Sequence, residues 1–299
     1  MNGILLIDKP KGFTSFDVVA KMRGIAHTRK IGHSGTLDPM ATGVLPLLIG
    51  NATKACDILP NEDKAYRAGF ALGKITDTED ISGTVLQTSD IRCTKSQVEA
   101  VLTRFTGDIM QVPPMYSAVS VGGKRLYELA RKGIEIERQA RPVTVYQLTL
   151  EDFDEASQTG TLYIHCGKGT YVRTICHDIG QALGCGAIMT SLRRTMAAGF
   201  DEGQCITLEE ASRLSECGEL ESRLLPVEQV FLCHPLLALN ERQLRLYKNG
   251  VKLRFEQLGL SADSPEIYRV QDADGSFLGL AKCRYETKEL IHYKNFVIA

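Results

Sequence analysis

The stretch Gly32-His-Ser-Gly-Thr-Leu-Asp-Pro-Met-Ala-Thr-Gly-Val-Leu-Pro46 is the most informative part of this 299-residue sequence. From Ile25 to Gly43 the chain has neither the alternation of a strand nor the spacing of a helix, and its glycines and Pro39 are typical of a structured loop. The apolar run Val44–Ile49 follows this loop and predicts a short buried strand. The sequence therefore predicts an irregular loop that leads directly into a strand.

Asp38 is the one acidic residue of this loop. Between Asp17 and Asp57 no other carboxylate occurs, whereas lysines, arginines and two histidines share the segment. A cation close to Asp38 would favour its ionised form, which suits a nucleophile or a general base. Pro39 biases Asp38 toward an extended backbone. The spacing leaves open the alternative of an aspartate that only forms a turn or cap hydrogen bond.

Strand and helix patterns lie on both sides of the loop. Apolar runs and alternation predict strands at Gly3–Ile7, Ala65–Gly73 and Gly160–Cys166, the second with Tyr66, Ala68, Phe70 and Leu72 on one face. Capping residues and helical spacing predict helices at 14–24 (with Phe16, Val19 and Met22 on the apolar face), 94–107, 124–132, 172–183 and from 207 onward. Because no regular strand-helix-strand repeat occurs, we expect an α+β fold.

The pattern of predicted secondary structure changes near His234-Pro235. Beyond it we expect one short helix over Asn240–Lys248 and several strands, two of them joined by a hairpin turn at Asp274-Gly275. The sequence therefore predicts two domains, a large one over residues 1–232 and a small β-rich one over 233–299.

Composition is that of an ordinary folded protein, with 43% hydrophobic and 24% charged residues. No apolar run approaches the roughly 20 residues that span a bilayer, and the N-terminus lacks the layout of a signal peptide. Nine cysteines without a C-x-x-C pair suggest neither disulfides nor a thiolate zinc site. We therefore expect a cytoplasmic protein.

The net charge of −1 hides an uneven distribution. Residues 1–54 hold seven lysines and arginines against three aspartates, whereas residues 201–225 hold seven acidic and two basic residues. The basic N-terminal part could therefore meet phosphate groups.

Motifs for nucleotide loops, a serine nucleophile or a metal site do not occur. G-x-G-x-x-G, the Walker pattern and G-x-S-x-G are absent, and His27 and His33 lie in a loop without metal-ligand spacing. We expect chemistry that needs neither a metal nor another cofactor.

The stretch 32–46 resembles the nucleophile motif of the TruB family, the bacterial tRNA pseudouridine-55 synthases. Five further segments match that family in order: Asp8–Gly12, Lys64–Arg67, Gln111–Ala118, Gly169–Thr174 and Leu192–Arg194. The likeness extends from about Gly3 to Val230, and the tail is similar to the small PUA-like RNA-binding domain of these synthases. The resemblance implies a mixed, largely antiparallel central sheet flanked by helices, with catalytic residues in the first domain and RNA binding in the second.

The resemblance also implies roles for single residues. Asp38 becomes the catalytic aspartate, Tyr66 the ring that stacks on the target uracil, and Arg173 a guanidinium that pairs with both oxygens of Asp38. His33 would help to displace the uridine, and Tyr171 and Leu192 would line the base pocket. Taken alone, Tyr66 and Leu192 would be core residues and Arg173 an exposed helix residue. Ser34 and Ser120 depart from the family pattern, and Ser120 removes one expected phosphate contact.

Basic segments should supply the remaining affinity for RNA. Lys9, Lys30 and Arg193 are the substrate-binding candidates among them, although such residues are more often part of a solvated surface. The implied partner is tRNA, bound by its T-arm with the target base flipped out; we expect no membrane, no obligate protein partner and a monomer.

The implied reaction is the isomerisation of the T-loop uridine to pseudouridine. Asp38 could start it by attacking C1′, by adding to C6 or by removing the ribose 2′-proton, and the sequence leaves these routes open. Two alternatives also remain: a synthase of the same fold that acts on another RNA, and a non-catalytic RNA-binding factor that assists tRNA folding.

Overall fold

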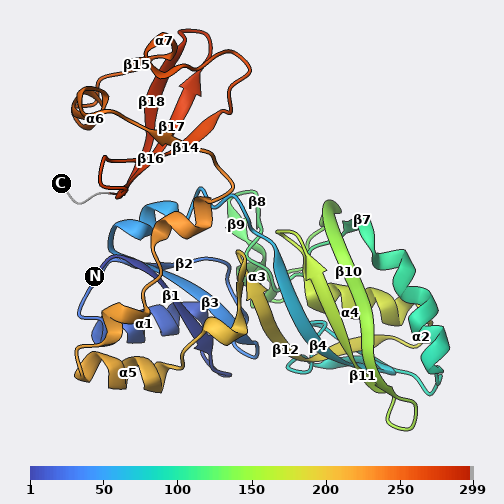
Figure 1. Ribbon diagram of the computed structural model, residues 1–299. Coiled ribbons are helices and arrows are strands. Elements are labelled where there is room, and N and C mark those ends of the chain that lie inside the picture. Colours follow the sequence, from blue (N-terminus) through green and yellow to red (C-terminus); the bar gives the residue numbers. More distant parts are fainter. Residues whose placement is uncertain (297–299) are drawn as a thin grey trace.

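A nine-stranded sheet is the centre of the computed structural model, which describes residues 1–296 (Figure 1). Seven strands follow the order β1-β3-β12-β4-β11-β10-β7, while β2 pairs with β3 and β13 with β12. The strands are β1 (Gly3–Lys9), β2 (Ile31–His33), β3 (Thr42–Ile49), β4 (Lys64–Leu72), β7 (Gly107–Gln111), β10 (Arg141–Asp154), β11 (Thr159–Cys166), β12 (Ala187–Ala197) and β13 (Phe200–Asp201). Within this sheet of the described residues only β3 and β12 pair in parallel, so the expected mixed, largely antiparallel sheet of an α+β fold is confirmed.

Helices pack against this sheet in two groups. Near the N-terminal strands, α1 (Ser15–Ile25) and α5 (Leu208–Glu216) bury apolar side chains against β1 and β3. Farther along, α2 (Lys95–Leu102) packs against β10, and α4 (Val172–Ala182) packs against β12 and β4, in a second apolar cluster. Thr14, Thr94 and Thr207 cap α1, α2 and α5 as the sequence predicts, because each hydroxyl accepts the N–H three residues later.

Two helix predictions are wrong in part. Phe16 is 63% exposed, and Val18 takes its expected place in the core beside Val19 and Met22. The segment predicted as a helix over 124–132 begins as a strand, β9 (Lys124–Arg125), which pairs with β8 (Ser120–Val121), and only α3 (Leu126–Ala130) is helical. Gly122 and Gly123 both have positive φ and form the turn between these two strands.

A five-stranded sheet occupies the C-terminal part, with the order β14-β16-β17-β18-β15. Its elements are β14 (Leu236–Ala238), α6 (Glu241–Lys248), β15 (Leu253–Arg254), α7 (Phe255–Leu258), β16 (Ile267–Gln271), β17 (Phe277–Arg284) and β18 (Glu289–Asn295). The expected helix and the expected hairpin between β16 and β17 are both present. A β-rich C-terminal part is thus confirmed, and Figure 1 shows it beside the end of the large sheet that holds β1–β3.

An apolar cluster joins the two sheets. Phe231, Leu280 and Phe296 pack with Leu48 of β3 and with Ala52. Lys54 and Lys294 add polar links, since Lys54 Nζ donates to the carbonyl of Asn295 at 2.8 Å and Lys294 Nζ lies 2.9 Å from Asp57 Oδ2. The C-terminal sheet is therefore fixed to the strand that follows the Asp38 loop.

The remaining strands are β5 (Lys74–Thr76) and β6 (Val85–Thr88), which form a hairpin after β4. No helix among residues 1–296 is both long and apolar enough to cross a membrane.

Candidate active site

A cavity of about 310 Å³ opens where β4, β12 and the N-terminal end of α4 meet the loop before β3. Five of the predicted site residues line it: Asp38, Tyr66, Tyr171, Arg173 and Leu192. They come from four separate parts of the sequence, and the antiparallel pairing of β4 with β12 brings Tyr66 and Leu192 to the same wall. The fold thus gathers these candidates into one concave site.

The Asp38 loop is held at three places. The N–H of Leu37 donates to the buried hydroxyl of Ser15 at 2.9 Å. The carbonyl of Pro39 accepts the N–H of Gly12 at 2.7 Å, and the carbonyl of Asp38 accepts the N–H of Ala41 at 3.0 Å. Asp38 itself keeps 36% of its side chain exposed. The loop backbone is therefore fixed while the carboxylate remains open to a ligand.

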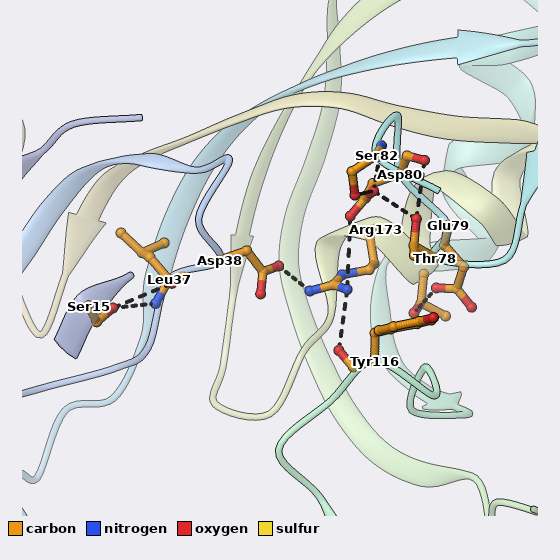
Figure 2. A network of polar contacts seen from close by, with 10 residues as sticks. Ser15, Leu37, Asp38, Thr78, Glu79, Asp80, Ser82, Tyr116 and Arg173 are labelled. Carbon is orange, nitrogen blue, oxygen red and sulfur yellow. Dashed lines mark hydrogen bonds and ion pairs between the residues drawn. The ribbon is translucent and has the colours of Figure 1, made fainter. Parts of the chain in front are cut away.

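Arg173 lies between two carboxylates (Figure 2). Its Nη2 donates to Asp38 Oδ2, while its Nη1 donates to the carbonyl of Tyr116 at 3.3 Å and lies 4.0 Å from Asp80 Oδ2. The expected pairing of the guanidinium with both oxygens of Asp38 is wrong, because Tyr116 and Asp80 occupy its other nitrogen. Arg173 is also buried, at 7% exposure, rather than an exposed helix residue.

Asp80 is the residue of this network that the sequence analysis missed. Its buried carboxylate accepts hydrogen bonds from the hydroxyls of Thr78 and Ser82 and from the Ser82 N–H, between 2.5 and 2.9 Å. The neighbouring Glu79 accepts the hydroxyl of Thr174, and burial raises the pKa of Glu79. No spacing marks Asp80, because its charged partner is distant in the sequence and only the fold brings the two together.

Tyr66 and Tyr171 form aromatic parts of the cavity wall. Tyr66 is only 6% exposed, and burial raises the pKa of its phenol to about 12, although the cation of Arg194 opposes this shift. The backbone of Tyr171 is fixed by buried Gln111, which accepts the Tyr171 N–H at 2.8 Å and donates to its carbonyl at 3.1 Å. The Tyr66 phenol is therefore uncharged at neutral pH.

The other predicted binding residues lie outside this cavity wall. His33 ends β2, half-buried, and burial lowers its pKa. Lys30 is exposed and donates to Asn51 Oδ1 at 2.7 Å. Arg193 forms ion pairs with Asp8 at 3.0 Å and with Glu202 at 2.6 Å.

Lys9 differs most from its predicted role. It has no accessible surface, and its ammonium donates to the carbonyls of Pro10, Phe13 and Pro39 at 3.1, 2.5 and 3.4 Å. Burial lowers its pKa to about 8. A side chain so enclosed cannot reach a phosphate in this conformation; it braces the carbonyl next to Asp38 instead.

Within residues 1–296 no three His, Cys, Asp or Glu side chains gather as a metal ion would require. The charged groups of the cavity wall are the carboxylates of Asp38 and Glu62, the ammonium groups of Lys64 and Lys168 and the buried guanidinium of Arg173, and phenols and hydroxyls complete it. A carboxylate held beside a guanidinium suits nucleophilic or proton-transfer chemistry.

Family models match most of the chain. Residues 23–172 match the N-terminal domain of the TruB family pseudouridylate synthases, and residues 173–231 match the C-terminal domain of tRNA pseudouridylate synthase B. Among curated proteins, tRNA pseudouridine synthase B of Pseudomonas fluorescens is 43% identical over 287 residues, which cover 94% of this chain and 92% of the relative. The enzyme of the same name from Geobacillus thermodenitrificans is 43% identical over 273 residues, 89% of this chain and 90% of the relative.

Solved structures share the fold. The match to a Cbf5-Nop10-Gar1 complex has a TM-score of 0.74 with 24% identity and covers 99% of this chain and 85% of that one. An H/ACA RNP bound to a substrate RNA containing 2′-deoxyuridine matches with a TM-score of 0.73 and 22% identity over 99% of this chain and 85% of that one. At these identities the likeness concerns the architecture alone.

Proposed function

The chain belongs to the TruB family of pseudouridylate synthases, and from this premise we propose that it converts the T-loop uridine at position 55 of tRNA to pseudouridine. The observation that carries the proposal is the ion pair of Asp38 with Arg173 at the wall of a cavity that Tyr66 also lines. The cavity, about 310 Å³, lies at the lower end of the size range of small-ligand pockets. A single flipped-out nucleoside is a ligand of that class.

Asp38 starts the reaction in this proposal. The bond from C1′ to N1 of uracil breaks, the base turns, a bond from C1′ to C5 forms, C5 loses its proton and N1 gains one. The substrate and the product are isomers, so no electrons enter or leave. Attack at C1′, addition at C6 and removal of the 2′-proton all use an ionised carboxylate, and all three remain open.

In this proposal Arg173 aims the Asp38 carboxylate at the base. The charged hydrogen bond from its Nη2 fixes one oxygen of that carboxylate. Asp80 and the carbonyl of Tyr116 hold the other end of the guanidinium, so that its orientation is set before substrate arrives. This preorganisation matters because the carboxylate then need not reorient when the base enters the cavity.

The tRNA must present its target base by flipping it out of the T-loop, at a cost of a few kcal/mol. Stacking on an aromatic ring returns about 1–3 kcal/mol of this cost, and Tyr66 is the ring proposed for it. We assign displacement of the uridine to His33, support of the pocket to Tyr171 and Leu192, and backbone contacts to Lys30 and Arg193. Residues 233–299 are proposed as an RNA-binding domain beside the catalytic domain of residues 1–232.

The direct test is the release of tritium from a tRNA transcript that carries tritium at C5 of its uridines. We expect release from the unmodified transcript and none above background from a transcript with cytidine at position 55. No release from either transcript would refute tRNA synthase activity and favour the non-catalytic RNA-binding alternative. Equal release from both would refute the T-loop specificity.

Tyr66→Phe and Tyr66→Leu separate stacking from hydroxyl chemistry. The phenylalanine variant keeps the ring, so we expect it to retain part of the activity. The leucine variant loses the stacking energy and should turn over roughly ten- to a hundredfold more slowly than the phenylalanine variant. Single-turnover rates of tritium release measure both. Equal rates in the two variants would remove the stacking role, and thermal unfolding checks that both variants fold.

A further inference from the structure

Arg194 is the largest fully buried side chain of the described residues, and the mechanism above does not use it. It lies on β12, directly opposite Tyr66 in the antiparallel pairing with β4 and opposite Gly43 in the parallel pairing with β3. A single residue therefore adjoins both the proposed stacking ring and the strand into which the Asp38 loop runs.

The guanidinium of Arg194 binds the chain on both sides of Asp38. Its Nη2 donates to the carbonyl of Gly35 at 3.0 Å, and its Nε donates to the carbonyl of Val44 at 2.7 Å. The two carbonyls flank residues 36–43, the part of the loop that carries Asp38. The planar guanidinium thus connects the two ends of this loop.

The two ends of the loop are glycines in left-handed conformations, Gly35 with φ 72° and Gly43 with φ 101°. A Cβ at Gly43 would lie 2.2 Å from the carbonyl oxygen of Arg194, and one at Gly35 would lie 3.1 Å from its Nη1. Glycine at both points permits this close approach, and glycine also permits other backbone conformations. Both points therefore need an external restraint to keep one conformation.

The charge of Arg194 has no carboxylate partner. Within residues 1–296 no carboxylate forms an ion pair with it; burial lowers its pKa, and the neighbouring Tyr66 hydroxyl partly opposes this shift. The pKa values of Lys64 and His33 are both lowered. Burial is the larger cause in each case, and the cation of Arg194 is the second. Burying a cation without a carboxylate partner costs folding free energy. If residue 194 only filled space, an apolar side chain of similar volume would stabilise the fold more.

We propose that Arg194 is a positioning residue that clamps the Asp38 loop at both ends and so sets the position of the Asp38 carboxylate relative to Arg173 and the flipped base. The inference rests on the proposed function for its catalytic consequence. Its structural part, the restraint of residues 35–44, can be measured without activity.

The test uses two variants. Arg194→Met removes the charge and the hydrogen bonds to the carbonyls of Gly35 and Val44, whereas Arg194→Lys keeps the charge but not the planar guanidinium. We expect the single-turnover rate to fall about a hundredfold in Arg194→Met, the scale on which a small misplacement of reacting groups acts. Arg194→Lys should fall between the parent and Arg194→Met. The dissociation constant for tRNA should stay within about twofold in both, since Arg194 has no surface with which to touch RNA.

Hydrogen exchange supplies the second readout. Peptides that cover residues 35–44 should exchange faster in both variants, because the amides of this loop lose their restraint. Arg92→Met is the control: the Arg92 guanidinium also binds two carbonyls, those of Glu155 and Ala156 at 2.5 and 2.6 Å, but it lies outside the cavity wall and the Asp38 loop. It should change neither the rate nor exchange in residues 35–44.

The outcomes distinguish this inference from the proposed function. Suppose the parent enzyme is active and both Arg194 variants show its rate and its hydrogen exchange. That result would overturn the role of Arg194 and leave the proposed function intact. If the parent released no tritium, the function would fall, and exchange at residues 35–44 would still decide the clamp. If Arg194→Met did not fold, Arg194→Lys would carry the test. A loss of rate that only followed a loss of tRNA binding would also overturn the clamp.

Discussion

Replacing Asp38 with asparagine should lower the release of C5 tritium from tRNA by about 10⁴-fold or more, the scale on which the loss of a catalytic nucleophile acts. The amide keeps the size of the carboxylate, and its oxygen can still accept the hydrogen bond from Arg173 Nη2. It carries no negative charge, however, so it can neither attack carbon nor take a proton effectively. Chemistry should therefore disappear while the loop keeps its conformation.

Binding and folding are the controls for the Asp38→Asn variant. Its dissociation constant for tRNA and its thermal unfolding should match those of the parent. Asp57→Asn is the matched substitution, because Asp57 is a 69% exposed carboxylate that pairs with Lys294 and is not part of the cavity wall. It should keep the parent rate. Tritium release at the parent rate by the Asp38→Asn variant would remove Asp38 from the chemistry altogether.

Arg173→Met should damage both stability and activity. Arg173 is buried, and its loss leaves the buried carboxylate of Asp80 without its cation. Breaking a buried ion pair by removing one partner costs about 3–5 kcal/mol of unfolding free energy. Asp38 would also lose the hydrogen bond that orients it, so we expect the single-turnover rate to fall at least about a hundredfold. Urea unfolding and tritium release measure the two effects.

A second substitution separates these two effects. Asp80→Asn in the Arg173→Met background removes the orphaned charge, and the amide can still accept the hydroxyls of Thr78 and Ser82. We expect this double variant to regain most of the lost stability but none of the lost rate, because Asp38 still lacks its partner. Recovery of the rate together with stability would mean that Arg173 acts only as a structural residue.

Local patterns predicted the local structure well. The capping pairs that begin at Thr14 and Thr94 and the alternation around Tyr66 appear as expected, because these features depend on residues a few positions apart. Phe16 and the segment 124–132 were predicted wrongly. An apolar residue can lie on the solvent side of a helix, and the Gly122-Gly123 turn changed the structure of the residues beside it.

The sequence by itself marked Asp38 as a candidate, since it is the lone carboxylate of a basic, glycine-rich segment, and the resemblance of that segment to the TruB family made it the proposed catalytic aspartate. Only the tertiary structure decided how that carboxylate is held. Lys9 is turned inward onto the carbonyl of Pro39, Asp80 takes the far side of Arg173, and Arg194 joins the two ends of the loop. These contacts depend on strand register and on packing between distant segments. Such distances are set by the whole sheet, and no local spacing of residues encodes them.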